Sequence, residues 1–152
     1  MPSIGLRLLC FVLVPRIRST CYYPISKVSK HSKLIFKALT NQEDDEVLFA
    51  VAEELGKIWE LHSDKTLYIP LLEKLAQSDE TVVREQAARS LISICEALSD
   101  AEIQNVFTPM VIRLAQAEWF TGRVTSCSFF YHAYPRSGAQ KERLRKKFME
   151  LC

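Results

Sequence analysis

The chain has 152 residues, of which 48% are hydrophobic and 25% charged, the composition of a globular protein. Its formal net charge of +2 does not by itself imply an acidic partner, and no run of 18 apolar residues is present that could form a membrane-spanning helix. With 4 glycines and 6 prolines, the chain is a poor fit to a sheet protein with many tight turns or to a glycine-rich phosphate loop.

Charge divides the chain into two segments. Residues 1–42 carry seven basic residues and no acid, whereas residues 43–152 have a net charge of −5. We expect residues 1–30 to be an atypical basic extension that is poorly ordered. A secretory apolar core at residues 8–14 and a mitochondrial presequence are the two alternatives. The basic residues are scattered without alternating aromatic residues, so no nucleic-acid partner is expected.

The cysteine usage is that of a reducing compartment. There are five cysteines, an odd number, and no two are spaced as C-x-x-C. Two of them fall on apolar helical stripes, where cysteine acts as a small hydrophobic residue. This usage predicts a cytoplasmic protein, with the nucleus as a second compartment and no membrane partner.

From about residue 31 onward, apolar residues recur at helical spacing. The first stripe consists of Val47, Leu48, Val51, Ala52, Leu55, Ile58 and Trp59, behind a run of acids that suits a helix N-terminus. A second helix is predicted over 67–77, with Tyr68, Leu71, Leu72 and Leu75 on one face. The third stripe consists of Val83, Ala87, Leu91, Ile94, Cys95 and Leu98. Ser99-Asp100 then ends this pair and can cap the next helix.

The plan repeats further along the chain. Ile103, Val106, Phe107, Met110, Val111 and Leu114 form the next stripe, and Val124, Cys127, Phe130, Tyr131 and Tyr134 the one after it. A last helix over 141–152 offers Leu144, Phe148 and Leu151, with no following helix to cover them. We expect Trp59, Phe107, Phe130 and Tyr131 to lie in the core.

Superposing the helix pairs reveals a period in the high thirties. Pro70 of one pair corresponds to Pro109 of the next, and Val51 of the preceding unit corresponds to Ala87. This period, with two helices per unit, predicts an all-α HEAT-repeat superhelix of the armadillo-like kind. The array would comprise units at about 31–62, 66–98 and 102–135 and a half unit at 139–152.

Several segments of this array resemble a known family. They are residues 45–56 (DEVLFAVAEELG), 80–84 (ETVVR), 113–115 (RLA), 119–123 (WFTGR) and 134–136 (YPR). The stretch from Glu43 to Cys152 resembles the scaffold (A, structural) subunits of serine/threonine protein phosphatase 2A, a HEAT-repeat family. It looks like a fragment that covers the second to fourth repeats of that family and half of the fifth.

The resemblance implies a non-catalytic scaffold. In that family the N-terminal part of the solenoid docks regulatory (B-type) subunits, and the C-terminal repeats hold the catalytic subunit. We therefore expect this chain to bind regulatory subunits, and the catalytic subunit to be held only by a full-length scaffold. The alternative is a generic HEAT- or armadillo-type adaptor of the nuclear-transport kind, which would bind its partner along the concave helices.

The turns between paired helices of such a solenoid line up as an exposed ridge. The predicted partner-binding residues on it are Asp45, Glu46, Asp79, Glu80, Glu118, Trp119 and Phe120. The acids suit basic patches on a partner, although helix N-terminal charge would also explain them. Large aromatic residues in a turn are typical of interface anchors. We expect Trp119 to contact the partner and Phe120 to pack on the neighbouring unit.

Arg84 and Arg123 occupy the same place in successive units. We expect an inter-repeat structural role for them, through pairing with the turn acids Asp79 and Glu118. The three histidines are far apart and match no metal-ligand spacing. No catalytic residue, metal site or cofactor is expected, because no cluster of polar groups suggests an enzyme.

Overall fold

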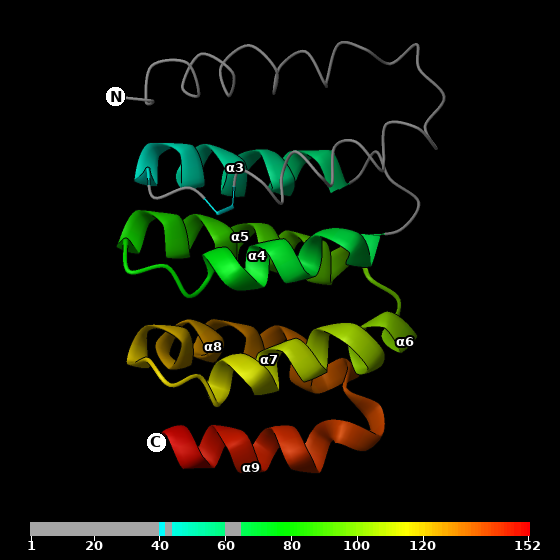
Figure 1. Ribbon diagram of the computed structural model, residues 1–152. Helices are drawn as coiled ribbons and strands as arrows, with labels where there is room; N and C mark the ends of the chain where they lie inside the picture. The colour runs from blue at the N-terminus through cyan, green and yellow to red at the C-terminus, as the bar shows by residue number, and fades with distance from the viewer. Residues whose placement is uncertain (1–39, 42–43, 60–64) are drawn as a thin grey trace, which may run out of the picture.

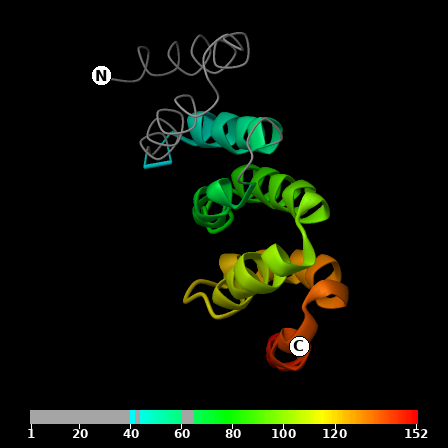
Figure 2. The same ribbon diagram turned by 90° about the vertical axis from the view of Figure 1, so that its right-hand side faces the viewer.

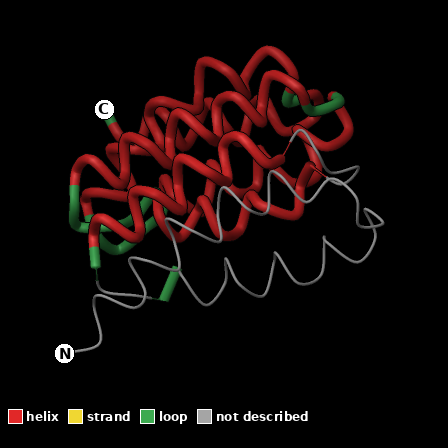
Figure 3. Tube along the Cα trace, turned by 90° about the horizontal axis from the view of Figure 1, so that it is seen from above, coloured by secondary structure: helices red, strands yellow, loops and turns green. Residues whose placement is uncertain are grey.

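A computed structural model describes residues 40–41, 44–59 and 65–152 of the chain. Helices and the turns between them make up this part, and it contains no strand (Figure 3). The basic extension predicted at residues 1–30 lies outside the described residues, as does part of the unit predicted at 31–62.

The described helices follow one another with short connections. In chain order they are α3 (Asp45–Ile58), the 3-10 turn η2 (Lys65–Tyr68), α4 (Ile69–Leu75), α5 (Thr81–Ala97), α6 (Asp100–Glu102), the π-helical segment η3 (Ile103–Phe107), α7 (Thr108–Ala115), α8 (Phe120–Ala133), the 3-10 turns η4 (Tyr134–Arg136) and η5 (Gly138–Gln140), and α9 (Lys141–Leu151).

These helices stack in two layers. Helices α3, α5 and α8 lie side by side in one layer, while α4 pairs with α5 and α7 pairs with α8 (Figures 1 and 2). Helix α9 packs against both α7 and α8. The all-α superhelical fold expected from the repeat period is confirmed.

Helix α3 begins where the sequence places negative charge. The Asp44 side chain accepts hydrogen bonds from the backbone N–H groups of Glu46 and Val47, at 3.1 and 3.4 Å, and so caps the helix. All seven apolar residues predicted for its stripe are buried, Trp59 included. The stripe thus faces the neighbouring helices of the stack.

Helices α3 and α5 approach each other closely at a glycine. A Cβ atom placed on Gly56 would lie 2.2 Å from the Ser90 Oγ. The Ser90 hydroxyl donates a hydrogen bond of 2.8 Å to the Ala52 carbonyl oxygen, so the buried serine has a partner on the facing helix. The stripe predicted for α5 is buried throughout.

The first helices of the second and third pairs begin differently. In the second pair Pro70 lies in the first turn of α4, where a missing N–H is tolerated. In the third pair a π-helical segment precedes Pro109, and the Thr108 N–H donates to the Ile103 carbonyl oxygen. Ser99 caps the start of this pair as predicted, in a capping box with Glu102.

The stripe predicted for α8 is wrong in all but one position. Phe130 is buried, but Val124 is 64% and Tyr131 81% exposed, and Cys127 and Tyr134 are exposed as well. The buried face consists instead of Thr121, Gly122, Thr125, Ser126, Phe129, Phe130 and Ala133. Small residues let α8 approach its neighbours closely. Of the four aromatic residues expected in the core, only Tyr131 lies outside it.

The last helix is covered better than the sequence predicts. Leu144 is fully buried, and the rings of Phe148 and Phe130 meet edge to face with centroids 5.2 Å apart. Phe148 keeps 41% of its surface exposed and Leu151 is half-buried. The expectation that all three apolar residues of α9 lie uncovered is therefore wrong for Leu144.

Candidate partner-binding site

The turns that precede α3, α5 and α8 lie at one edge of the stack, the left edge in Figure 1. We call this edge the ridge. It carries all seven residues predicted to bind a partner, and all seven are exposed: Asp45, Glu46, Asp79, Glu80, Glu118, Trp119 and Phe120.

The three turns share one backbone geometry at the residue before each helix. Asp44, Glu80 and Trp119 all hold an extended conformation, with φ of −86°, −81° and −81°. Only the first of these three caps its helix with its side chain; Glu80 and Trp119 form no such bond. The N-cap residue of α8 is thus a tryptophan whose side chain forms no capping hydrogen bond with the helix.

Two arginines hold the turns in shape. Arg84 Nη1 donates to the carbonyl oxygens of Ser78 and Asp79, at 2.8 and 2.7 Å. Arg123 Nη1 donates to the Ala117 and Glu118 carbonyl oxygens, at 2.8 and 2.6 Å. The predicted pairing with the acid side chains is wrong, because the guanidinium groups bond backbone carbonyls. These bonds lie within one unit, so they brace each turn rather than tie units together.

A shallow hollow of about 390 Å³ lies between the N-terminal ends of α3 and α5. Asp45, Glu46 and Glu80 stand around it, and the side chains of Phe49 and Val82 also line it. Phe49 is 36% and Val82 52% exposed. The hollow therefore combines apolar surface with carboxylates at its margin.

The third turn of the ridge has a different chemistry. Trp119 is 73% exposed, as expected for a residue that contacts a partner. Phe120 is 64% exposed, so the expectation that it packs on the neighbouring unit is wrong. The first turn of α8 presents two large aromatic side chains to solvent, next to the exposed Val124.

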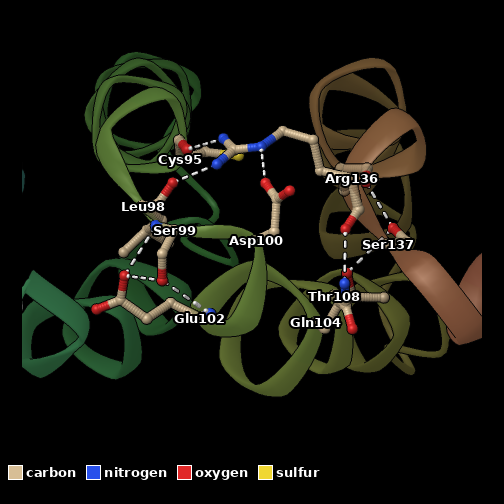
Figure 4. Close-up of polar contacts among 10 residues, drawn as sticks. Cys95, Leu98, Ser99, Asp100, Glu102, Gln104, Thr108, Arg136 and Ser137 are labelled. Atoms are coloured by element: carbon tan, nitrogen blue, oxygen red, sulfur yellow. Dashed lines mark hydrogen bonds and ion pairs between the residues drawn. The ribbon is translucent and has the colours of Figure 1, made fainter.

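The opposite edge of the stack holds a network of polar contacts between units (Figure 4). Arg136, which follows α8, donates from Nη1 to the Cys95 carbonyl oxygen at 3.2 Å and from Nη2 to the Leu98 carbonyl oxygen. Its Nε forms an ion pair of 2.6 Å with Asp100. One side chain thus satisfies the carbonyl groups at the end of α5 and holds the start of the next unit.

Further bonds at this edge join η3 and the start of α7 to the turns after α8. The hydroxyl groups of Thr108 and Ser137 lie 3.2 Å apart, and Ser137 also donates to the Ala133 carbonyl oxygen. The Gln140 amide donates to the Gln104 carbonyl oxygen. In a regular α-helix that carbonyl would accept from the Thr108 N–H, which bonds Ile103 instead. The π-helical turn therefore frees an acceptor that the following unit uses.

A second inter-unit bond joins the first helices of neighbouring pairs. Arg113 and Glu73 form a two-point ion pair, with Nε–Oε1 and Nη2–Oε2 distances of 2.8 and 2.7 Å. The hydrogen bonds from Glu73 raise the pKa of the Arg113 guanidinium. The apolar pattern does not predict the roles of Arg113 and Arg136. The signal that could have revealed the first is the separation between Glu73 and Arg113, which is close to one repeat period.

The described residues lack a cluster of metal-binding side chains. Groups of three or more His, Cys, Asp or Glu that could hold an ion are absent from residues 40–41, 44–59 and 65–152. Within the same ranges, no helix is long and apolar enough to cross a membrane. The ridge, an exposed surface suited to contact with a protein, is the candidate site.

The chain resembles known repeat proteins in sequence. The HEAT repeat family profile matches residues 69–98, which span α4 and α5. The chain is 40% identical over 123 residues to the beta isoform of the human serine/threonine-protein phosphatase 2A 65 kDa regulatory A subunit. It is 37% identical over 115 residues to the protein phosphatase 2A scaffold subunit of Dictyostelium discoideum. It is 40% identical over 115 residues to the regulatory A subunit of protein phosphatase PP2A from Schizosaccharomyces pombe.

These matches cover 72–78% of this chain and 20% of each relative. The chain therefore spans about a fifth of the length of the curated relatives it matches. The resemblance to phosphatase 2A scaffold subunits, stated above from short segments, is confirmed over most of the chain.

Proposed function

We propose that this HEAT-repeat chain, a relative of the phosphatase 2A scaffold subunits, acts as a non-catalytic scaffold in a protein serine/threonine phosphatase 2A complex. It docks B-type regulatory subunits through the ridge. The observation that carries the proposal is the 40% identity over 123 residues to a human phosphatase 2A regulatory protein of 65 kDa. In this proposal the scaffold consists of units at about 31–62, 66–98 and 102–135 and a half unit at 139–152.

The ridge performs this role by its geometry. Stacked helix pairs hold three turns at one edge in a fixed order, and Arg84 and Arg123 brace two of those turns from within. Exposed carboxylates attract a basic partner surface and speed its approach. Exposed aromatic side chains then bury apolar area in the complex, which is where most binding energy is concentrated in protein interfaces.

In this role the chain binds regulatory subunits and does not itself bind the catalytic subunit. The family's catalytic subunit is held by repeats that this chain does not resemble, so we expect no direct retention of it by these 152 residues. The proposed location is the cytoplasm, with the nucleus as the second compartment. A nuclear-transport type of adaptor is the competing function, and the names of the relatives favour the phosphatase scaffold over it.

A direct binding measurement tests the proposal. The full chain would be immobilised and exposed separately to purified B-type regulatory subunits and to the purified catalytic subunit. We expect binding of a regulatory subunit that is weakened in Trp119→Ala but unchanged in Tyr131→Ala. Tyr131 is the matched control, since it is an exposed aromatic residue of the same helix that lies outside the ridge. Binding of the catalytic subunit in the absence of other subunits would contradict the proposal.

A further inference from the structure

We infer that the ridge recognises a partner segment by two side chains of different chemistry, which we call its anchors. One is a basic side chain that binds in the hollow between α3 and α5, and the other is an apolar side chain that packs on the aromatic residues at the start of α8. This inference rests on the proposed function, because the segment is taken to belong to a regulatory subunit. It specifies the chemistry by which the ridge selects its partner.

The hollow is suited to a lysine or an arginine. Asp45 of α3 and Glu80, the residue before α5, both line it, and neither forms an ion pair with a described residue. The exposed surfaces of Phe49 and Val82 also line it. Long basic side chains bury their aliphatic stems on apolar surface and keep the charged group among polar ones. A lysine or arginine side chain would cover Phe49 and Val82 and bring its charge to the two carboxylates.

Three positions of the α5 end of the hollow and its neighbourhood are apolar one unit further along, although Glu118 keeps the charge of Asp79. Trp119 stands where the preceding unit has Glu80, Phe120 where it has Thr81, and Val124 where it has Glu85. All three replacements are apolar, and Trp119 is 73% and the other two 64% exposed. A basic side chain would find a single carboxylate here, that of Glu118, whereas an aliphatic or aromatic one would bury area against the indole and phenyl rings.

The spacing of the two anchors follows from the helix packing. Neighbouring helices of a layer are roughly 8–10 Å apart between axes, so the hollow between α3 and α5 lies about 12–15 Å from the start of α8. A segment that follows the ridge must therefore present its basic anchor and its apolar anchor at a matching separation. The ridge thereby distinguishes a segment with this order from one that is basic or apolar throughout.

The salt dependence of binding separates the two anchors. The dissociation constant of a purified B-type regulatory subunit for the full chain would be measured at about 0.01 M and about 0.15 M salt, between which the screening length falls from about 30 to about 8 Å. The variants are Asp45→Asn with Glu80→Gln, which removes charge at constant size, and Trp119→Ala. Glu96→Gln serves as the control, because Glu96 is an exposed carboxylate of α5 away from the ridge.

We expect the wild-type chain and Glu96→Gln to bind several-fold more tightly at low salt. The double charge variant should bind about tenfold more weakly at low salt and show a clearly smaller salt dependence than the wild-type chain. Trp119→Ala should bind about tenfold more weakly at both salt concentrations and keep the wild-type salt dependence. Thermal melting of each variant confirms that the fold is intact.

Each outcome bears on a different statement. If the regulatory subunit binds and its salt dependence is the same for the double charge variant as for the wild-type chain, the basic anchor is overturned and the proposed function stands. Full affinity in Trp119→Ala overturns the apolar anchor. If no regulatory subunit binds the wild-type chain, the proposed function fails, and the inference fails with it.

Discussion

Trp119 occupies a position in which a short polar side chain would serve the helix better. It is the N-cap residue of α8, it forms no capping hydrogen bond, and 73% of it is exposed. Aspartate at an N-cap accepts hydrogen bonds from the first N–H groups, and its negative charge interacts favourably with the positive end of the helix dipole. A tryptophan here forgoes that stabilisation, which fits a residue whose role is contact with a partner.

Trp119→Asp should therefore stabilise the chain while it weakens partner binding. We expect a gain of about 1 kcal/mol in the free energy of unfolding, seen as a rise of about 2–4 °C in the melting temperature. Trp119→Ala supplies the control, since it removes the ring without adding a cap and should not raise the melting temperature. A lower melting temperature in both variants would show that the indole packs against the fold.

Cys95 should be protected from alkylation. Burial raises its pKa from an ordinary value of 9.0 to about 11, although the nearby Arg136 opposes the shift. At a pH below 9 the thiol stays protonated and hidden, whereas Cys127 and Cys152 are exposed. Iodoacetamide treatment of the native chain followed by peptide mass spectrometry should find these two exposed cysteines modified and Cys95 intact.

The same pKa shift makes stability depend on pH in the alkaline range. Below pH 9 both the folded and the unfolded chain hold this proton, so the contribution of the buried thiol is fully present. Between pH 9 and about 11 the unfolded chain releases the proton first, and that contribution is lost. Cys95→Val should show a smaller loss of unfolding free energy than the wild-type chain over this range in urea titrations. An equal loss in both would contradict the assignment to Cys95.

At the scale of single helices, sequence patterns predicted some faces well and one face badly. The stripes of α3 and α5 are correct because their buried positions hold large aliphatic residues, such as Leu55 and Leu91, at regular spacing. Helix α8 buries small residues such as Gly122 and Ser126, which carry little hydrophobic signal, and exposes Val124. The buried face of α8 is determined by how closely the neighbouring helices approach it, and the spacing of apolar residues in the sequence does not contain that information.

The contact of α3 with α5 gives a test of close packing. Gly56→Ala would place a methyl group 2.2 Å from the Ser90 Oγ and 2.9 Å from its Cβ. We expect a loss of about 1–3 kcal/mol of stability in urea denaturation, because the two helices must move apart.

Ser90→Gly should rescue part of this loss. The double variant would be more stable than the sum of the two single changes predicts, since both atoms that crowd the methyl group are then removed and the Cα atom of residue 90 lies at an ordinary distance of 3.4 Å. Strict additivity of the two changes would show that the helices separate for another reason.

At the scale of the whole molecule, we expect the hydrogen bonds and ion pairs that join the units to contribute more to stability the more deeply they are buried. Arg136→Met removes the donors to the carbonyl groups of Cys95 and Leu98 while it keeps much of the side-chain length. We expect a loss of about 2 kcal/mol, as for hydrogen bonds that involve a charged group. Amide hydrogen exchange should become faster around residues 98–104.

Arg113→Met is the comparison for that variant. In its ion pair with Glu73, 58% of the arginine side chain is exposed but only 14% of the glutamate side chain, so removing the arginine should cost about 1 kcal/mol, less than the loss expected for Arg136→Met. A larger loss in Arg113→Met than in Arg136→Met, by thermal or urea unfolding, would reverse this ranking of the two bonds.

The repeat period predicted the stack but not what joins its members. Equivalent positions in successive units identified the turns and singled out Arg84 and Arg123, although these arginines brace their own turns and do not join units as predicted. The partners of Arg136 are backbone carbonyls at a helix end, and a carbonyl has no signature in the sequence. The hollow between α3 and α5 likewise arises from side chains that are distant in sequence, Asp45 and Glu80, which only the stacking brings together.

The uneven placement of these bonds gives the joint between α5 and α8 a preferred direction of bending. Spreading the stack on the Arg136 side stretches the bonds from that guanidinium to the end of α5. Spreading it on the ridge side separates two turns that are braced internally, and the Glu73–Arg113 ion pair that crosses near them has an exposed arginine side chain. We therefore expect this joint to open more easily on the ridge side than at Arg136, so a partner that contacts both Glu80 and Trp119 would change the distance between them without breaking the Arg136 bonds.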